Sequence, residues 1–157
     1  MTLRIKVDTG ELDAAFDGIA QAAIESARPA AQAGIQVIYE QARRNAPRGE
    51  KAHLFYGKAS RNAPPGQKKA LAFGPYQPGN LQRSIYQAFS KDSTPGRAVY
   101  DVSWNPREAP YAYMVEYGTV RAAAVPFMRP AVSAFPRAEQ AMRERFFDEM
   151  QKRGVGR

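Results

Sequence analysis

Apolar side chains recur every three or four residues in the first part of this chain, a spacing that places them on one face of an α-helix. The helix is predicted from Leu12 to about Arg44, with apolar positions at Leu12, Phe16, Ile19, Ala23, Ile35, Ile38 and Ala42. Proline inside a helix removes a hydrogen bond and clashes with the preceding turn, so Pro29 predicts a kink or a break near Ser26 to Arg28. The many alanines either serve as good helix formers or let a neighbouring helix approach closely.

The same spacing returns near the end of the chain, where it predicts a second amphipathic helix from Arg129 to Arg153. Its apolar stripe consists of Phe135, Ala138, Met142, Phe146 and Met150. Pro136 indicates a bend or a restart early in this helix. Gly154 is expected to end it, because glycine adopts the left-handed conformation of a helix C-terminus without steric cost.

Alternation of apolar and polar side chains predicts short strands as well. Leu3, Ile5 and Val7 alternate with charged residues, which is typical of a strand at the edge of a sheet. A hairpin is expected from two further strands, at residues 85–89 and 98–104. These elements predict an α+β fold, in which a long kinked N-terminal helix and a C-terminal helix pack on one face of a small antiparallel sheet.

The size and composition favour one globular domain that spans residues 1–157. The hydrophobic fraction is 44% and the charged fraction 24%, as in soluble globular proteins. No apolar run approaches the length of a membrane span, and the N-terminus lacks the layout of a signal peptide, so we expect a protein that stays in the cytoplasm where it is made. The chain has no cysteine, which excludes disulfides, thiol catalysis and cysteine-based metal sites.

Residues 48–78 form a segment of different composition, rich in proline, glycine and positive charge. Six basic residues face one acidic residue there, which accounts for five of the eight net positive charges of the chain. The aromatic residues Phe55, Tyr56, Phe73 and Tyr76 are interleaved with them. Three interpretations stay open: a solvated loop whose aromatic rings pack back onto the domain, a contact with a nucleic-acid backbone, or a contact with an acidic protein.

The sequence offers no recognisable catalytic, cofactor or metal site. His53 is the one histidine, and no nucleophile-elbow pattern accompanies it. The glycine-rich patterns that cradle phosphates are missing, and the carboxylates are spread along predicted helices at solvent-exposed spacing. We therefore expect a protein that is not an enzyme and that needs no cofactor or metal.

The most informative stretch consists of two motifs, YAYMVEYGT at residues 111–119 and PFMRPA at residues 126–131. Pro110 suits the first turn of a short helix, and Gly118 supplies its stop. Pro126 and Pro130 restrict the backbone on both sides of Phe127, so that this ring is presented on a stiff corner from which a second helix can start.

These two motifs resemble a pattern of the neck or tail-completion family of tailed bacteriophages, which includes the minor tail protein Z-like proteins of lambdoid phages. A second piece of the family pattern, of the form aP..tGnLr.Si, is similar to residues 45–47 (NAP) together with residues 79–85 (GNLQRSI). Here an insertion separates its two parts, and Pro78 stands where the pattern usually has threonine. The basic segment is thus a departure from the family.

The resemblance implies a structural protein of the virion neck, assembled in the cytoplasm of the bacterial host. Such proteins form homo-oligomeric rings, commonly hexamers, between a head-closure or connector protein and a tail terminator or tail tube protein. A protomer of this kind needs one surface for its ring neighbours and another for each partner ring. The ring that terminates the tail tube is the alternative within the same class.

Large amphipathic side chains of the two motifs are the expected contacts with partner proteins. They are Tyr113, Glu116, Tyr117, Phe127 and Arg129. The alternative for Tyr117 and Phe127 is a place in the domain core, where they would hold the two motifs together.

The basic segment either orders against an acidic partner ring or reaches genomic DNA in the channel. Its candidate contact residues are Lys51, Lys58, Arg61, Lys68 and Lys69. A rival from a different functional class is a free nucleic-acid-binding protein, which the pI of about 9.9 also favours. That rival predicts tight and strongly salt-dependent binding to DNA, whereas a neck protein is expected to bind DNA weakly or not at all.

Overall fold

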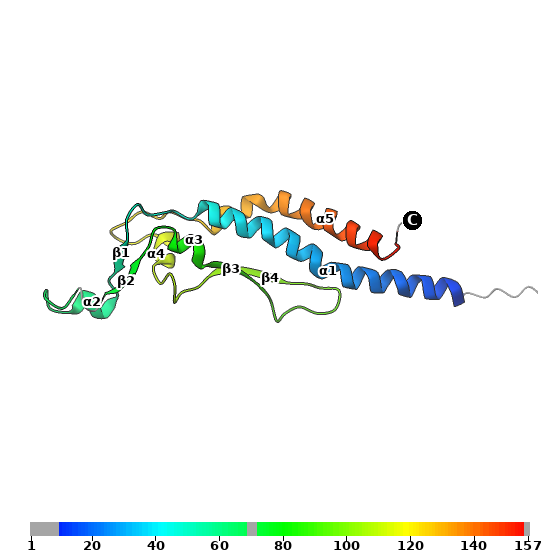
Figure 1. The fold of residues 1–157 in the computed structure, drawn as a ribbon, viewed down its shortest axis with the longest axis horizontal. Coiled ribbons are helices and arrows are strands. Elements are labelled where there is room, and N and C mark those ends of the chain that lie inside the picture. The colour runs from blue at the N-terminus through cyan, green and yellow to red at the C-terminus, as the bar shows by residue number, and fades with distance from the viewer. Residues whose placement is uncertain (1–9, 69–71, 156–157) are drawn as a thin grey trace, which may run out of the picture.

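A computed structural model describes residues 10–68 and 72–155 of the chain (Figure 1). Its elements are α1 (Gly10–Asn45), β1 (His53–Phe55), α2 (Lys58–Asn62), β2 (Phe73–Tyr76), α3 (Asn80–Ser84), β3 (Ile85–Phe89), β4 (Tyr100–Trp104), α4 (Ala112–Tyr117), the 3-10 helix η1 (Arg129–Ala134) and α5 (Phe135–Lys152). The predicted α+β fold is confirmed. The strand expected at Leu3, Ile5 and Val7 lies outside the described residues.

The molecule is elongated, and α1 runs along most of its length (Figure 1). Helix α5 lies beside the middle of α1, and the hairpin of β3 and β4 lies on the other side of α1. The short elements β1, β2 and α2 occupy one end, while the first turns of α1 project past α5 at the other. Within the described residues, two separate two-stranded antiparallel sheets take the place of the single sheet that was expected.

Helix α1 continues without a break through Pro29, and Figure 1 shows its axis changing direction part-way along. Pro29 has no N–H to donate to the carbonyl of Glu25, four residues earlier. One turn before, the hydroxyl of Ser26 donates a hydrogen bond of 2.7 Å to the carbonyl of Ala22, a contact that tends to bend helices. A kink is therefore the right prediction, and a break is the wrong one.

Small side chains allow α1 and α5 to pack closely. The buried positions on this face of α1 recur every four residues, at Ala22, Ser26, Ala30 and Gly34. A Cβ atom placed on Gly34 would lie 3.1 Å from the carbonyl oxygen of Ala138 on α5, and closer still to the side chain of Met142. Of the two interpretations of the alanine-rich sequence, close helix approach describes this face.

The first turns of α1 differ from the prediction, because their apolar side chains are exposed. Leu12, Phe16 and Ile19 are 56%, 61% and 44% exposed. Helix α5 ends at Lys152, and the next residue, Arg153, pairs with Glu25 of α1 at 3.1 Å. The earlier turns of α1 therefore extend beyond the helix that covers the rest of this face.

The predicted hairpin is confirmed, with β4 beginning at Tyr100 rather than at Ala98. Its antiparallel register runs from the pair Ile85 and Trp104 to the pair Phe89 and Tyr100. A hairpin that was not predicted lies inside the basic segment, where His53 pairs with Tyr76 in β1 and β2. The described residues of that segment, 48–68 and 72–78, contain no long element, as its prolines and glycines indicated.

The hydrophobic core lies where the C-terminal end of α1 meets α3, α4 and the start of η1. Its buried members are Ala42, Ala46, Leu81, Ile85, Ala109, Ala112, Phe127 and Ala131. The ring of Trp104 packs edge-on against Phe127, with centroids 5.8 Å apart. Residues of all the motifs singled out in the sequence therefore meet in one cluster.

The C-terminal helix restarts and stops as predicted. The chain changes from the 3-10 helix η1 to α5 at Phe135, and Pro136 lies in the first turn of α5. At the other end, Gly154 has a φ of +82°, and its N–H donates to the carbonyl of Gln151 at 3.0 Å. The N–H of Val155 donates to the carbonyl of Met150 at 3.1 Å, which completes a Schellman cap.

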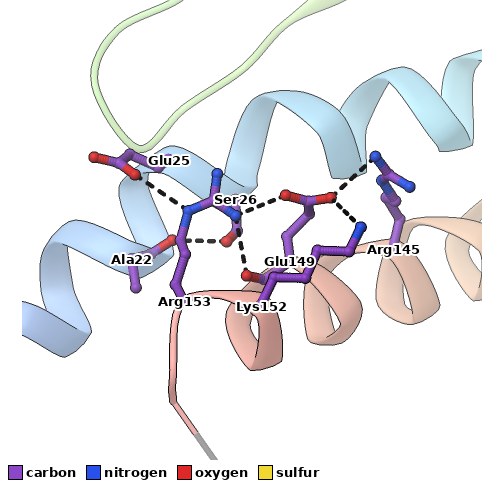
Figure 2. A network of polar contacts seen from close by, with 7 residues as sticks. All are labelled: Ala22, Glu25, Ser26, Arg145, Glu149, Lys152 and Arg153. Atoms are coloured by element: carbon purple, nitrogen blue, oxygen red, sulfur yellow. Dashed lines mark hydrogen bonds and ion pairs between the residues drawn. The ribbon is translucent and has the colours of Figure 1, made fainter.

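A charged network fastens the end of α5 to α1, as Figure 2 shows. The carboxylate of Glu149 lies 2.7 Å from Arg153, 2.9 Å from Arg145 and 3.0 Å from Lys152. Arg153 also donates to Glu25, so it joins the two helices. The hydrogen bond from Arg153 and then that from Lys152 lower the pKa of Glu149 from its ordinary value of 4.5 to about 2.

We predict that this network makes the fold sensitive to acid. Because the pKa of Glu149 is lower in the folded state, the carboxylate stabilises the fold above pH 4.5, and this contribution is lost as the pH falls towards 2. The Glu149→Gln variant should therefore show a shallower fall of the unfolding temperature between pH 4.5 and 2 than the parent chain. Asp148→Asn, at the exposed neighbouring carboxylate outside the network, is the control. Parallel curves for the parent and Glu149→Gln would contradict the prediction.

Candidate partner-binding surface

The carboxylate of Glu116 joins the two sequence motifs. It is 1% exposed at the end of α4, and its oxygens face the first turn of η1. Oε2 accepts hydrogen bonds from the backbone N–H groups of Phe127 at 2.7 Å and Met128 at 2.9 Å. Oε1 accepts from the backbone N–H of Arg129 at 3.1 Å and from its Nε at 3.0 Å. One side chain thus satisfies three consecutive donors that precede the helical hydrogen bonds of η1.

These donors keep Glu116 ionised in spite of its burial. Burial acts to raise the pKa of the carboxyl group, because it removes water from the charged form. The backbone N–H groups of Met128, Phe127 and Arg129, and then the Arg129 side chain, outweigh that effect and lower the pKa. The interaction is therefore a charge-assisted one, which is stronger than a hydrogen bond between neutral groups.

The turn after α4 brings the second motif back to the first. Gly118 has a φ of +77°, and its N–H donates to the carbonyl of Met114 at 2.9 Å. A Cβ atom at this position would lie 2.8 Å from the backbone nitrogen of Ala124, so glycine is required both for the conformation and for the close approach. The N–H of Val125 then donates to the carbonyl of Val115 at 2.8 Å.

Three side chains form an exposed surface over this junction, here called the tyrosine–arginine surface: Tyr113, Tyr117 and Arg129. Tyr113 and Tyr117 are 62% and 51% exposed, and their ring centroids lie 4.6 Å apart. The guanidinium of Arg129 lies 5.0 Å from the Tyr117 ring and donates to the carbonyl of Glu116 at 2.9 Å. Aromatic and arginine side chains that are held in place before binding are typical anchors of protein interfaces.

The expected interface role of Glu116 and Phe127 needs a correction. Both are buried within the chain, with exposures of 1% and 0%, so neither side chain is available to a partner in this conformation. Phe127 lies in the domain core, which was the alternative to an interface role. The same alternative was open for Tyr117, but its side chain is exposed. The sequence did not predict the burial of Glu116, because most of its partners are backbone groups that no side-chain pattern reveals.

The split family-like pattern comes together in space across its insertion. The side-chain amide of Gln82 donates to the carbonyl of Ala46 at 3.0 Å, and Arg43 donates to the carbonyl of Gln82 at 3.2 Å. Asn45 donates to the carbonyl of Phe127 at 3.2 Å. Residues 45–47, residues 79–85 and the PFMRPA motif therefore form one contiguous unit.

Comparison with known proteins gives no relative. No protein-family model, curated protein or solved structure matches this chain.

The basic segment presents its charges to solvent and turns part of its aromatic surface inwards. Lys51, Lys58, Arg61 and Lys68 are exposed, and Lys69 lies outside the described residues. Rings of the segment pack around Tyr111 of the first motif, with centroid distances of 4.9 Å for His53, 5.2 Å for Tyr76 and 6.4 Å for Phe55. The role of Tyr111 as their common contact was missed, although its place in the motif marked it out.

The remaining aromatic residues of the segment point outwards. Phe73 is 56% exposed and Tyr56 is 41% exposed. The interpretation of a loop whose rings pack back onto the domain therefore holds for Phe55 and Tyr76. The rings of Phe73 and Tyr56 and the lysine and arginine side chains of the segment lie at the surface, where a partner can reach them.

Within residues 10–68 and 72–155, no cluster of three or more histidine and carboxylate side chains could hold a metal ion. None of the helices there is both long enough and apolar enough to cross a membrane.

Proposed function

We propose that this chain is a structural virion protein of the neck of a tailed phage. Copies of it form a ring, commonly a hexamer in such assemblies, that joins the capsid connector or head-closure protein to the tail terminator or tail tube. The role is architectural, and the protein is not an enzyme. The tail terminator ring is the neighbouring position that the same features would suit.

One observation carries the proposal. The pieces of sequence that resemble the family pattern are separated along the chain, yet they form a single folded unit that is closed by the buried Glu116 carboxylate. The same unit leaves Tyr113, Tyr117 and Arg129 exposed as one fixed group. A stiff junction with exposed anchors is what a protein needs in order to join two preformed rings.

A stop codon early in this reading frame tests the proposal. Electron microscopy of the lysate should show full heads and complete tails that are separated, and the wild-type gene supplied in trans should restore joined particles. Intact infectious particles without the protein would remove the neck proposal.

We predict that the Tyr113→Ala, Tyr117→Ala double variant fails to restore joining in that assay. Both rings are more than half exposed, so their loss should change the unfolding temperature little while it removes two interface anchors. The matched control is Tyr113→Phe, Tyr117→Phe, which keeps the rings and should restore infectivity. Full complementation by the alanine variant would exclude this surface but not the neck role.

Nucleic-acid binding is the second candidate function, and the exposed lysine and arginine side chains of the basic segment favour it. Its test is the binding of duplex DNA to the purified protein at several salt concentrations. The neck proposal expects weak binding, which changes little when Lys51, Lys58, Arg61 and Lys68 are replaced by glutamine. Tight binding that weakens steeply with salt and is lost in the quadruple variant would instead establish the DNA-binding alternative.

A further inference from the structure

The projecting end of α1 carries an apolar ridge that nothing in the described chain covers. Leu12, Phe16 and Ile19 are spaced four and three residues apart, so they share one helix face. That face is the continuation of the one that packs on α5 further along α1. Figure 1 shows these turns extending past the end of α5 into solvent. Three exposed large apolar side chains in one row are typical of the anchors by which a helix binds in a groove.

The middle of the same molecule has an apolar groove with a volume of about 480 Å³. Its floor is made by small residues of α1, namely Ala27, Ala30 and Ala31. One wall consists of Met142, Phe146 and Phe147 of α5, and the other is the loop between β3 and β4 at residues 96–98. Phe147 is 62% exposed at the rim. A floor of alanines lets the ridge of another helix approach closely.

The charges of the ridge and of the groove are opposite in sign. The projecting turns that carry the ridge also carry Glu11 and Asp17, and the structure gives neither an ion-pair partner within its described ranges. Arg97 and Arg143 border the groove. Arg28 borders a neighbouring hollow beside Phe89, which shares residues 96–98 with the groove. Arg143 already pairs with Glu139 at 2.7 Å, and Arg28 lies 4.5 Å from the Phe89 ring. Complementary borders of this kind orient a docking helix and speed its association.

We propose that the ridge at Leu12, Phe16 and Ile19 of one copy docks in the groove that α1, α5 and the β3–β4 loop form in a second copy. A chain cannot fill its own groove, because the ridge and the groove floor belong to the same continuous helix. Pairing of two ridges would bring two acidic ends of α1 together, and like charges oppose it. The contact is therefore head-to-tail, a type that generates a ring when the rotation closes. That these contacts close into a ring rests on the proposed function.

Cross-linking of the full-length purified protein tests the contact, since the chain has no native cysteine. Ala20→Cys places a thiol beside the ridge, and Ala98→Cys places one on the groove wall; both keep the apolar anchors. With a short thiol-specific cross-linker, a mixture of the two variants should give a covalent dimer in much larger amount than either variant alone. The matched control replaces Ala20→Cys by Val120→Cys, an exposed position outside both surfaces, and should give little dimer.

Adding Phe16→Glu to the Ala20→Cys chain should reduce the cross-linked dimer by about tenfold or more, because it removes a central anchor. Circular dichroism should show an unchanged fold, since Phe16 is exposed. An Ala20→Cys chain that cross-links to itself as well as to Ala98→Cys would overturn the head-to-tail contact, and so would a dimer that Phe16→Glu leaves intact. The readout does not involve phage particles, so intact particles in the stop-codon experiment would remove the neck role and leave this result standing.

Discussion

Replacing Glu116 by alanine should destabilise the fold by about 3 kcal/mol, because three backbone N–H groups and one guanidinium lose their common acceptor. Each buried donor left without a partner costs roughly 1–3 kcal/mol, and some of this is recovered when water enters beside the partly exposed Arg129. Glu116→Gln should cost less, since its carbonyl oxygen can still accept while its amide group faces the remaining donors. Urea denaturation monitored by circular dichroism measures both values.

The control for Glu116 is Glu139→Ala. Glu139 also pairs with an arginine at 2.7 Å, but the side chains of Arg143 and Glu139 are 71% and 45% exposed. Exposed pairs contribute about 0–1 kcal/mol, so this variant should remain close to the parent protein. Equal losses for the two alanine variants would show that the Glu116 carboxylate does not hold the motifs together.

Replacing Gly34 by valine should cost about 3 kcal/mol, because α1 and α5 are in contact at this residue. Even a single Cβ atom would collide with the side chain of Met142 and approach the Ala138 carbonyl to 3.1 Å, so the larger valine side chain must displace Met142 and strain the contact between the helices. Thermal and urea unfolding measure the loss. Combining Gly34→Val with Met142→Ala should recover part of it, since the two sites share the same space.

Gly18 supplies the matched control in the same helix. A Cβ atom there would meet nothing within 4 Å, so Gly18→Ala should stabilise the chain by about 0.5–1 kcal/mol through helix propensity alone. If Gly34→Val were as harmless as Gly18→Ala, the close packing of α1 on α5 would be wrong.

Elements with strong local signals were predicted well. Each of these signals depends on a few neighbouring residues. They are the apolar period of α1, the restart of the helix at the proline of α5, the helix stops at Gly118 and Gly154, and the alternation in the β3–β4 hairpin. What the sequence did not reveal depends on contacts between distant segments. The exposed start of α1 is one case, because the apolar spacing of Leu12 and Phe16 is the same whether or not α5 reaches them.

In the candidate site too, features that depend on neighbouring residues were predicted, and features that depend on distant contacts were not. Its location in the two motifs was predicted, and Tyr113, Tyr117 and Arg129 are exposed as an interface requires. Glu116 was expected to contact a partner protein as part of the first motif, which requires an exposed side chain. Its burial follows from the return of the chain after Gly118, which places backbone donors over the carboxylate, and no local rule predicts that return.

The pairing of His53 with Tyr76 has a consequence for how this protein can diverge. Together with the hydrogen bond from Gln82 to Ala46, it brings the two ends of the basic segment side by side, so the segment leaves and re-enters the domain through one narrow stem. The rings of His53 and Tyr76 cover Tyr111, but none of the buried residues of the core cluster belongs to the described part of this segment. Lengthening, shortening or exchanging the residues beyond this stem would therefore leave the scaffold intact, and related proteins could acquire new partners there without redesigning the rest of the molecule.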